Sequence, residues 1–446
     1  MACKDIPYDL LKKYDRAVPR YTSFPTTVHF SHDISQAYYA HLISSPAAED
    51  HVSLYIHIPF CRHLCHYCGC HTKAVNNYNP VQAYLLYLHK EIQKVGETLA
   101  HKPHVSSLHF GGGTPNMLKS GDMETLIEKL KTYFHFDETT DIDIELDPRL
   151  LEIENIKALA DVGVSRVSLG VQDFNPDVQN AVNRIQPFEK IQDDVLALRE
   201  SGIRNINFDL MIGLPLQTAE NVTLNAERAM SLLPDRMAVF AYAHVPWMKK
   251  HQKLLEKYEL PDTAARYEMN TIMQNVFTGA GYDSIGIDHY AHRLDPLFRA
   301  KENGALHRNF QGYTADETQT IIGFGISAIS SFKGAYIQNT TDSKTYREAL
   351  QDNRFPVQRG RILTGEDIVR RGLIEKLMCS FDLDMNDLGD IRYDSGGLNE
   401  LEQDEIIRFD HGRLRVTGRG KPFTRIVASC FDPYFQQEEN RHAKAV

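Results

Sequence analysis

The sequence lacks any uninterrupted apolar run that approaches the length of a membrane span. Its first residues contain no apolar signal core followed by a small-residue cleavage site. The residue after Met1 is Ala2, so the glycine that N-myristoylation requires is also missing. We therefore expect a cytoplasmic protein with no membrane partner.

An excess of basic residues is missing as well. Lysine and arginine together number 49 against 59 aspartate and glutamate residues, which gives a formal net charge of −10 at pH 7. General nucleic-acid-binding proteins usually carry a basic excess, so we expect no nucleic-acid partner. The acidic balance still permits an anionic substrate, provided that a local basic pocket holds it.

Cysteine is scarce, with seven residues in 446, yet four of them share one short loop: Cys61, Cys65, Cys68 and Cys70. In a reducing cytoplasm, clustered thiols bind metal more often than they form disulfides. Thiolates are soft ligands that suit both zinc and the iron of an iron–sulfur cluster. A zinc site remains an alternative at this point, because four histidines lie in the same part of the chain: His57, His63, His66 and His71.

The spacing of the first three cysteines is Cys-x3-Cys-x2-Cys. Cys70 follows Cys68 too closely to reach a separate corner of a four-iron cluster easily. Three protein thiolates would leave one iron without a protein ligand. An open metal position is typical of a catalytic site and not of a structural one.

Short β-rich runs alternate with longer stretches of helical pattern, which predicts βα units on a parallel sheet. We expect an α/β fold with a partial (β/α)6 barrel. The expected strands cover residues 52–58, 105–110, 141–146, 164–171, 204–212 and 236–245. Unusual residues fall at or near the carboxyl ends of these runs, where barrels of this kind carry their chemistry.

The chain divides into four expected parts. We expect an N-terminal strap or lid over 1–47, the barrel over 48–290, a barrel extension and linker over 291–355, and a mostly helical C-terminal domain over 356–446. The strap contains "VPRYTSFPTT" at 18–27, whose prolines and threonines favour an irregular segment. Such a segment is expected to be a poor core element but a reasonable lid.

A helix start is expected at Thr364, since Asp367 follows it three positions later. Asp209 sits in the otherwise apolar "FDLMIG". A buried carboxylate is costly unless it is paired or hydrogen-bonded. The sequence therefore indicates a functional role for Asp209 or an ion pair with a nearby arginine.

The cysteine triplet after the first expected strand, Tyr67 before the third cysteine and "GGGTP" (111–115) after the second expected strand resemble the radical S-adenosylmethionine (SAM) superfamily. The chain as a whole is similar to one family within it, the oxygen-independent coproporphyrinogen III oxidases. The segments that carry this resemblance occur in family order: "PRYTSFPT", "YIHIPFCRHLCHYCGC", "LHFGGGTPNML", "IELDPR", "RVSLGVQDF", "NFDLMIGLP" and "FAYAHVPW".

This resemblance implies a radical SAM oxidoreductase. Its substrate would be coproporphyrinogen III, of which two propionates become vinyl groups to give protoporphyrinogen IX in haem biosynthesis. One [4Fe–4S] cluster per chain and two SAM molecules are implied as cofactors, because two propionates need two radicals. A reductant and an electron acceptor, both unidentified, are implied as partners, and the family resemblance favours a monomer.

The resemblance also implies roles for individual residues. Cys61, Cys65 and Cys68 would hold the cluster. The implied SAM-binding residues are Tyr55, Tyr67, Gly112, Gly113, Thr114, Glu145, Gln172, Arg184, Asp209, Ala243 and Ile329. No residue is assigned a catalytic role. Arg20, in the strap, is the candidate partner for a substrate propionate, because guanidinium groups bind carboxylates with two hydrogen bonds.

Two alternatives remain. The first is another radical SAM enzyme of haem or porphyrin metabolism, although those relatives tend to lack the Gly-Cys after the third cysteine and the strap. The second is a non-enzymatic metal-binding or haem-trafficking protein. That reading leaves "GGGTP", Glu145 and Asp209 without a purpose.

Overall fold

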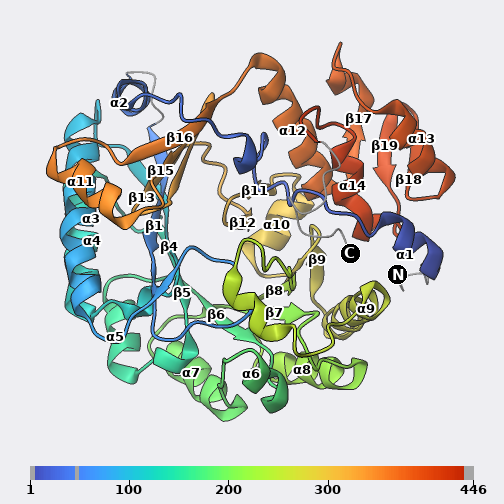
Figure 1. The fold of residues 1–446 in the computed structure, drawn as a ribbon, viewed down its shortest axis with the longest axis horizontal. Helices are drawn as coiled ribbons and strands as arrows, with labels where there is room; N and C mark the ends of the chain where they lie inside the picture. Colours follow the sequence, from blue (N-terminus) through green and yellow to red (C-terminus); the bar gives the residue numbers. More distant parts are fainter. Residues whose placement is uncertain (1–5, 46–49, 436–446) are drawn as a thin grey trace.

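Twelve strands form one curved sheet at the centre of the protein (Figure 1). The computed structural model describes residues 6–45 and 50–435. The order of strands across the sheet is β16-β15-β14-β13-β1-β4-β5-β6-β7-β8-β10-β9. The strands are β1 His51–Ile58, β2 Phe60–Cys61, β3 Lys73–Ala74, β4 His104–Gly112, β5 Asp141–Leu146, β6 Arg166–Gln172, β7 Asn205–Ile212, β8 Arg236–Ala241, β9 Asp283–Ile285, β10 His289–Ala291, β11 His307–Asn309, β12 Gly312–Thr314, β13 Ile321–Phe324, β14 Ile329–Phe332, β15 Ala335–Asn339, β16 Val357–Ile362, β17 Asp382–Asp384, β18 Ile407–Asp410 and β19 Arg413–Val416.

The six expected strands correspond to β1, β4, β5, β6, β7 and β8, which pair in parallel in this order. Helices connect them and lie outside the sheet, as Figure 1 shows for α3 to α8. The helices are α1 Tyr8–Tyr14, α2 Gln36–Ser44, α3 Asn79–Thr98, α4 Ser120–Tyr133, α5 Ile153–Asp161, α6 Pro176–Ala181, α7 Phe188–Glu200, α8 Ala219–Ser231, α9 Thr263–Gly279, α10 Pro296–Glu302, α11 Ser343–Gln351, α12 Gly365–Ser380, α13 Ser395–Gln403 and α14 Thr424–Ser429. The predicted partial (β/α)6 barrel is therefore confirmed.

Further strands extend the sheet on both sides of the barrel. On one side β13 pairs in parallel with β1, and β14, β15 and β16 follow in antiparallel order. On the other side β10 pairs antiparallel with β8, and β9 pairs with β10. The sheet ends at β16 and β9, so the barrel is open rather than closed.

Alternation along the strands separates a polar inner face from an apolar outer face. On β5, Ile144 and Leu146 are buried in the main hydrophobic core, whereas Glu145 between them lines a polar pocket. On β7, Phe208 and Leu210 are buried in the same core, and Asp209 faces the same pocket as Glu145. A period of two is what a strand imposes, so each strand presents its polar residues to one side.

The N-terminal segment packs on the C-terminal domain, which Figure 1 shows beside α1. Val18, Tyr21 and Phe24 are 0%, 4% and 1% exposed, and they belong to the hydrophobic core formed with α12, α13 and α14. The segment is irregular, as predicted, but the expectation that it is a poor core element is wrong. Prolines and threonines reduce regular structure, yet the aromatic and apolar side chains between them still bury their surface.

The C-terminal part combines helices with a three-stranded sheet in the order β17-β19-β18. Its first helix, α12, begins as predicted. The Thr364 side chain accepts from the Asp367 N–H at 3.0 Å, and the Asp367 carboxylate accepts from the Thr364 N–H at 3.0 Å. This reciprocal pair satisfies two backbone donors that the first helical turn would otherwise leave without partners.

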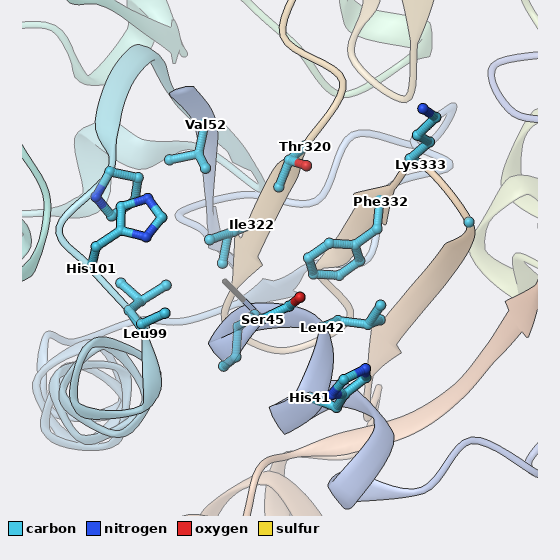
Figure 2. A pocket seen from close by; sticks show the side chains of 14 residues that line it. His41, Leu42, Ser45, Val52, Leu99, His101, Thr320, Ile322, Phe332 and Lys333 are labelled. Atoms are coloured by element: carbon cyan, nitrogen blue, oxygen red, sulfur yellow. The ribbon is translucent and has the colours of Figure 1, made fainter. Parts of the chain in front are cut away.

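An apolar cavity of about 200 Å³ lies at the end of the sheet where the strands begin (Figure 2). Its lining side chains come from α2, from the segment between α3 and β4, and from the starts of β1 and β13. None of the residues that the sequence singled out lies in it. Among the described residues, no helix combines the length and the apolar character that crossing a bilayer requires.

Candidate functional site

A polar pocket of about 160 Å³ lies at the carboxyl ends of the parallel strands, at the opposite end from the apolar cavity. We call it the rim pocket. It brings together the three predicted cluster ligands and eight of the predicted SAM-binding residues. These residues are Cys61, Cys65, Cys68, Tyr67, Gly112, Gly113, Thr114, Glu145, Gln172, Arg184 and Asp209.

The cysteine loop is held at both ends and along its length. Its ends pair as the short parallel strands β2 and β3. From the segment after β8, Lys249 donates to the Cys70 carbonyl at 2.8 Å, and Gln252 donates to the Tyr67 carbonyl at 2.9 Å. The ring of His251 lies 2.8 Å from the Cys68 carbonyl. These contacts satisfy loop carbonyls that have no partner in the sheet and so fix the loop over the barrel.

The glycine segment packs directly against the start of the cysteine loop. The Gly113 N–H donates to the Ile58 carbonyl, and the Thr114 N–H donates to the Phe60 carbonyl, both at 2.8 Å. A Cβ on Gly113 would lie 2.4 Å from the Phe60 carbonyl oxygen. Only glycine permits this approach, so the segment keeps the first cysteine and the end of β4 at a fixed separation.

Two guanidinium groups face the sulfur of Cys65. Nη2 of Arg149 and Nη1 of Arg184 each lie 3.5 Å from Cys65 Sγ. Both also pair with one oxygen of Asp147, at 2.6 Å from Arg149 and 3.4 Å from Arg184. Burial alone would raise the pKa of Asp147, but the two arginines hold it below its ordinary value. The two arginines therefore connect the sulfur of Cys65 to the carboxylate of Asp147.

Cys68 and Cys70 share a hydrogen bond between their thiol groups. This bond lowers the pKa of Cys68 to about 6 and raises the pKa of Cys70 well above its ordinary value. Cys61 differs, because burial raises the pKa of its thiol to about 11 although the Thr72 hydroxyl lies 3.2 Å from its sulfur. In the absence of metal, Cys68 is therefore the more readily ionised of the two hydrogen-bonded thiols.

Glu145 lies at the end of β5 and is held by its neighbours. Its carboxylate is 3.3 Å from the His109 ring nitrogen and accepts from the Gly112 N–H at 3.3 Å. Enclosure in the barrel would raise its pKa, but these hydrogen bonds keep the pKa below the ordinary value. Glu145 is therefore ionised at neutral pH and can accept hydrogen bonds from a ligand.

The pKa of Asp209 is shifted in the opposite direction from that of Glu145. Burial and the nearby charge of Glu145 raise its pKa to about 6, although Ser168 and Asn207 donate to its two oxygens at 3.0 and 2.9 Å. The sequence left open an ion pair with an arginine. The described partners of Asp209 are instead a hydroxyl and an amide. A buried carboxylate with a raised pKa that faces a pocket is common at binding sites.

The backbone at Gln172 is strained. Its φ is +64°, and the pairing of β6 with β7 shifts register between Gly170 and Gln172. A side chain larger than that of glycine rarely adopts this conformation outside turns. The irregularity points the Gln172 side chain into the rim pocket, and strained residues of this kind concentrate at functional sites.

Three predicted SAM-binding residues lie outside the rim pocket. The Tyr55 hydroxyl is 2.9 Å from His57 Nδ1, and its ring stacks on His109 with centroids 5.9 Å apart. The Ala243 carbonyl accepts from Gln252 at 3.2 Å. Ile329 begins β14 and packs against a small buried group that includes Phe30 and Tyr336.

The donor set suits a cluster better than a single ion. Among the described residues, no group of three or more histidine, cysteine, aspartate or glutamate side chains converges closely enough to bind one metal ion. A [4Fe–4S] cluster places each thiolate on a different iron, so its ligands need not meet at one point. Four thiols line the pocket beside two guanidinium groups, and the three with Cys-x3-Cys-x2-Cys spacing fit this cofactor.

Sequence reasoning missed several residues of the site. Asp147 and Arg149 were part of the quoted "IELDPR" but received no role, and His109 and Ser168 were not considered. Period-two spacing could have found Asp147 from Glu145, because both point to the same side of one extended segment. His109 lies two residues before Gly111 and could have been found in the same way.

The comparisons with known proteins agree with this geometry. Residues 55–227 match the model of the radical SAM superfamily. An oxygen-independent coproporphyrinogen III oxidase from Bradyrhizobium diazoefficiens is 40% identical over 450 residues, covering 98% of this chain and 99% of the relative. A protein of the same name from Escherichia coli is 36% identical over 449 residues, covering 98% of each chain.

A solved structure is similar over nearly the whole chain. It is that of a coproporphyrinogen III oxidase from Escherichia coli, described as a radical SAM enzyme. The TM-score is 0.89 at 34% sequence identity, and the match covers 97% of this chain and 100% of that one. The similarity therefore includes the N-terminal segment and the C-terminal domain as well as the barrel.

Proposed function

The chain belongs to the family of oxygen-independent coproporphyrinogen III oxidases, and from that premise we propose how its own residues carry out the reaction of the family. The protein is a radical SAM oxidoreductase. It converts two propionate side chains of coproporphyrinogen III to vinyl groups without oxygen, which gives protoporphyrinogen IX in haem biosynthesis. One observation supports the roles that we propose for particular residues. The predicted cluster ligands and most of the predicted SAM-binding residues line the same pocket, the rim pocket.

A [4Fe–4S] cluster and two SAM molecules are the cofactors. When bound, they supply an electron and the 5′-deoxyadenosyl radical that removes a hydrogen from the propionate β-carbon. The organic chemistry belongs to the cofactors, and the protein orients the reactants and excludes competing reactions.

Cys61, Cys65 and Cys68 are the proposed cluster ligands. Arg149 and Arg184 support this role, because their positive charges lie 3.5 Å from the Cys65 sulfur and offset negative charge on the thiolates. The hydrogen bonds from Lys249 and Gln252 to loop carbonyls hold the loop in place over the pocket. Cys70 is proposed to interact with Cys68 without serving as a ligand.

The SAM-binding residues act through charge and close backbone approach. Glu145 is held ionised by His109 and offers carboxylate oxygens to the polar hydrogens of SAM. Gly112 and Gly113 keep side chains away from the wall of the pocket at the end of β4. Tyr55, Ala243 and Ile329 lie outside the rim pocket, and two SAM molecules need more room than this pocket of about 160 Å³ offers. That difference supports a role for these three residues in a second, adjoining site.

The remaining partners are also proposals. Arg20 donates to the Ala241 carbonyl at 3.3 Å, which puts its guanidinium at the end of β8 and supports a contact with a substrate propionate. We propose a reductant that delivers single electrons and an acceptor for the electron released on decarboxylation. A monomer in the cytoplasm is proposed on the grounds of family resemblance.

The test is an anaerobic reaction of the iron- and sulfide-reconstituted protein with coproporphyrinogen III, SAM and a chemical reductant. Product analysis by mass should find protoporphyrinogen IX. A colourless protein that binds zinc and releases no deoxyadenosine would contradict the assignment. Cleavage of SAM with a methylated or ring-opened tetrapyrrole as product would indicate a different radical SAM enzyme.

A further inference from the structure

A second cavity lies at the carboxyl ends of β7 and β8. Its volume is about 100 Å³, and we call it the arginine cavity. It is lined by Arg20 from the N-terminal strap, Arg266 and Asn270 from α9, Ala241 from β8, Asp288, and Arg425 from α14. The strand β7 contributes Asp209 to the rim pocket and Ile212, three residues nearer its carboxyl end, to this cavity.

Positive charge exceeds negative charge around this cavity. Among the described residues that line it, Asp288 is the one acidic side chain, against three arginines. Asp288 is already engaged, because His289 Nδ1 lies 2.6 Å from its carboxylate and Arg308 Nη1 lies 3.9 Å away. Arg266 has a second acidic neighbour, Asp15, at 3.4 Å. Asp288 is the acidic group whose charge Arg20, Arg308 and Arg425 share.

The guanidinium groups are also short of hydrogen-bond acceptors. Arg308 lies behind the lining, where it contacts Asp288 at 3.9 Å and the Arg20 carbonyl at 3.5 Å, and its own Nε and Nη1 have no hydrogen-bond partner among the described residues. The buried Nε of Arg266 lacks one as well. A buried donor without an acceptor is costly, and more so when it is charged. This arrangement is costly for the protein alone and favourable once an anion enters.

The pKa values of the arginines also reflect the excess of positive charge around the cavity. Burial and the charges of Arg20 and Arg308 lower the pKa of Arg425 to about 9. Burial also lowers the pKa of Arg20, and Arg308 adds to that effect. Both groups remain charged at neutral pH, so the cavity keeps its positive character under working conditions.

We propose that the arginine cavity binds a carboxylate of a propionate that is not undergoing reaction, and so anchors the tetrapyrrole while another propionate faces the rim pocket. This inference rests on the proposed function. Three separate parts of the chain contribute the arginines, so the strap and the C-terminal domain form substrate-binding surface together with the barrel. Guanidinium groups suit the task because they bind carboxylates with paired hydrogen bonds.

The test uses the reconstituted protein under anaerobic conditions and coproporphyrin III, the stable oxidised tetrapyrrole with four propionates, in a fluorescence titration. Arg20→Gln and Arg425→Met should each weaken binding by roughly tenfold or more, since a hydrogen bond to a charged group contributes about 1.5–3 kcal/mol. Arg425→Lys keeps the charge and should give an intermediate loss. Arg408→Gln, an exposed arginine on β18 of the C-terminal domain, is the matched control.

The tetramethyl ester of coproporphyrin III separates charge from shape. It should bind more weakly than the acid, and its affinity should not change in Arg20→Gln or Arg425→Met. Iron and sulfide content shows whether each variant has folded, and Arg20→Gln carries the test if Arg425→Met fails to fold. Affinity for the acid equal to wild type in a folded Arg20→Gln protein would overturn the proposal. A loss of affinity for SAM without a loss for coproporphyrin III would overturn it too, because the anion would then be the carboxylate of SAM.

Failure of this inference can be distinguished from failure of the proposed function. If the wild-type protein forms protoporphyrinogen IX while both variants bind coproporphyrin III normally, the proposed function is supported and the anchoring role is contradicted. If the wild-type protein binds the porphyrin through these arginines but forms no product, the proposed function is contradicted and the anion site is supported.

Discussion

The guanidinium of Arg184 lies between the sulfur of Cys65 and the carboxylate of Asp147, 3.5 Å from the first and 3.4 Å from the second. The sequence had suggested only a SAM contact for this arginine. Its position couples the cysteine loop to the ends of β5 and β6, because it also donates to the Gly170 carbonyl at 2.6 Å. One side chain thus connects the proposed cluster ligands with the proposed SAM site.

Replacing Arg184 by Met should weaken both parts of this connection. Asp147 keeps Arg149 as a partner, so we expect a loss of about 1–3 kcal/mol in the free energy of unfolding rather than complete unfolding. Urea denaturation of the cluster-free protein measures this loss. The control is Arg204→Met, since Arg204 is exposed and does not line the rim pocket. Equal stability of the two variants would contradict the structural role of Arg184.

Replacing Cys61, Cys65 or Cys68 by Ser should abolish binding of iron and sulfide while leaving the fold largely intact. A hydroxyl is a hard and weakly acidic ligand where a soft thiolate is needed, and the barrel core does not include the loop sulfurs. Iron and sulfide analysis after anaerobic reconstitution is the measurement. Cys70→Ser is the matched control on the same loop and should keep a near wild-type content. If Cys70→Ser lost its iron and sulfide while Cys68→Ser kept them, Cys70 and not Cys68 would be the cluster ligand.

The raised pKa of Asp209 predicts a pH-dependent contribution to stability. Its pKa is about 6 in the folded protein and 3.8 ordinarily, so the folded state holds this proton more tightly than the unfolded state. The contribution is fully present below the ordinary pKa and is lost as the pH rises through about 6. Asn mimics the neutral form. The unfolding free energy of Asp209→Asn should therefore rise relative to wild type between about pH 4 and about pH 7.

Urea denaturation across this pH range measures the difference between Asp209→Asn and wild type. Asp161→Asn, an exposed aspartate in α5, provides the baseline. A difference that stays constant with pH would show that Asp209 is ionised in the folded protein throughout the range.

Phe24→Ala tests whether the N-terminal segment is part of the C-terminal core. Phe24 is 1% exposed in the same hydrophobic cluster as α12 to α14, so truncation should lower the free energy of unfolding by about 3–5 kcal/mol. Val28→Ala changes an exposed residue of the same segment and should have little effect. Normal stability of Phe24→Ala with reduced product formation would instead support a lid that contributes nothing to the core.

Prediction from the sequence succeeded where the pattern is local. The six strands of the barrel and the cap at Thr364 follow from short-range periodicity or from motifs with fixed spacing. The family resemblance supplied eleven residues that line the rim pocket, but it did not supply Asp147, Arg149 or Ser168. The burial of Tyr21 and Phe24 could not be predicted in this way, because their partners lie about 400 residues later in the chain. A segment of irregular structure gives no periodic signal for such contacts.

The electrostatics of the site also needed the three-dimensional structure. Whether Asp209 is paired with an arginine or faces a pocket depends on Ser168 and Asn207, which belong to adjacent strand positions across the sheet. The convergence of Arg20, Arg266 and Arg425 likewise joins three distant segments. Motifs identify residues along the chain, whereas charge balance arises only when distant segments meet.

The central claim is that this chain converts coproporphyrinogen III to protoporphyrinogen IX by radical chemistry. The most direct measurement counts deoxyadenosine and protoporphyrinogen IX in the same anaerobic reaction of the reconstituted wild-type protein. Each propionate that becomes a vinyl group should consume one SAM, so the account predicts two deoxyadenosine molecules for each protoporphyrinogen IX formed. Deoxyadenosine formed in the presence of coproporphyrinogen III with no vinyl-bearing product would contradict it.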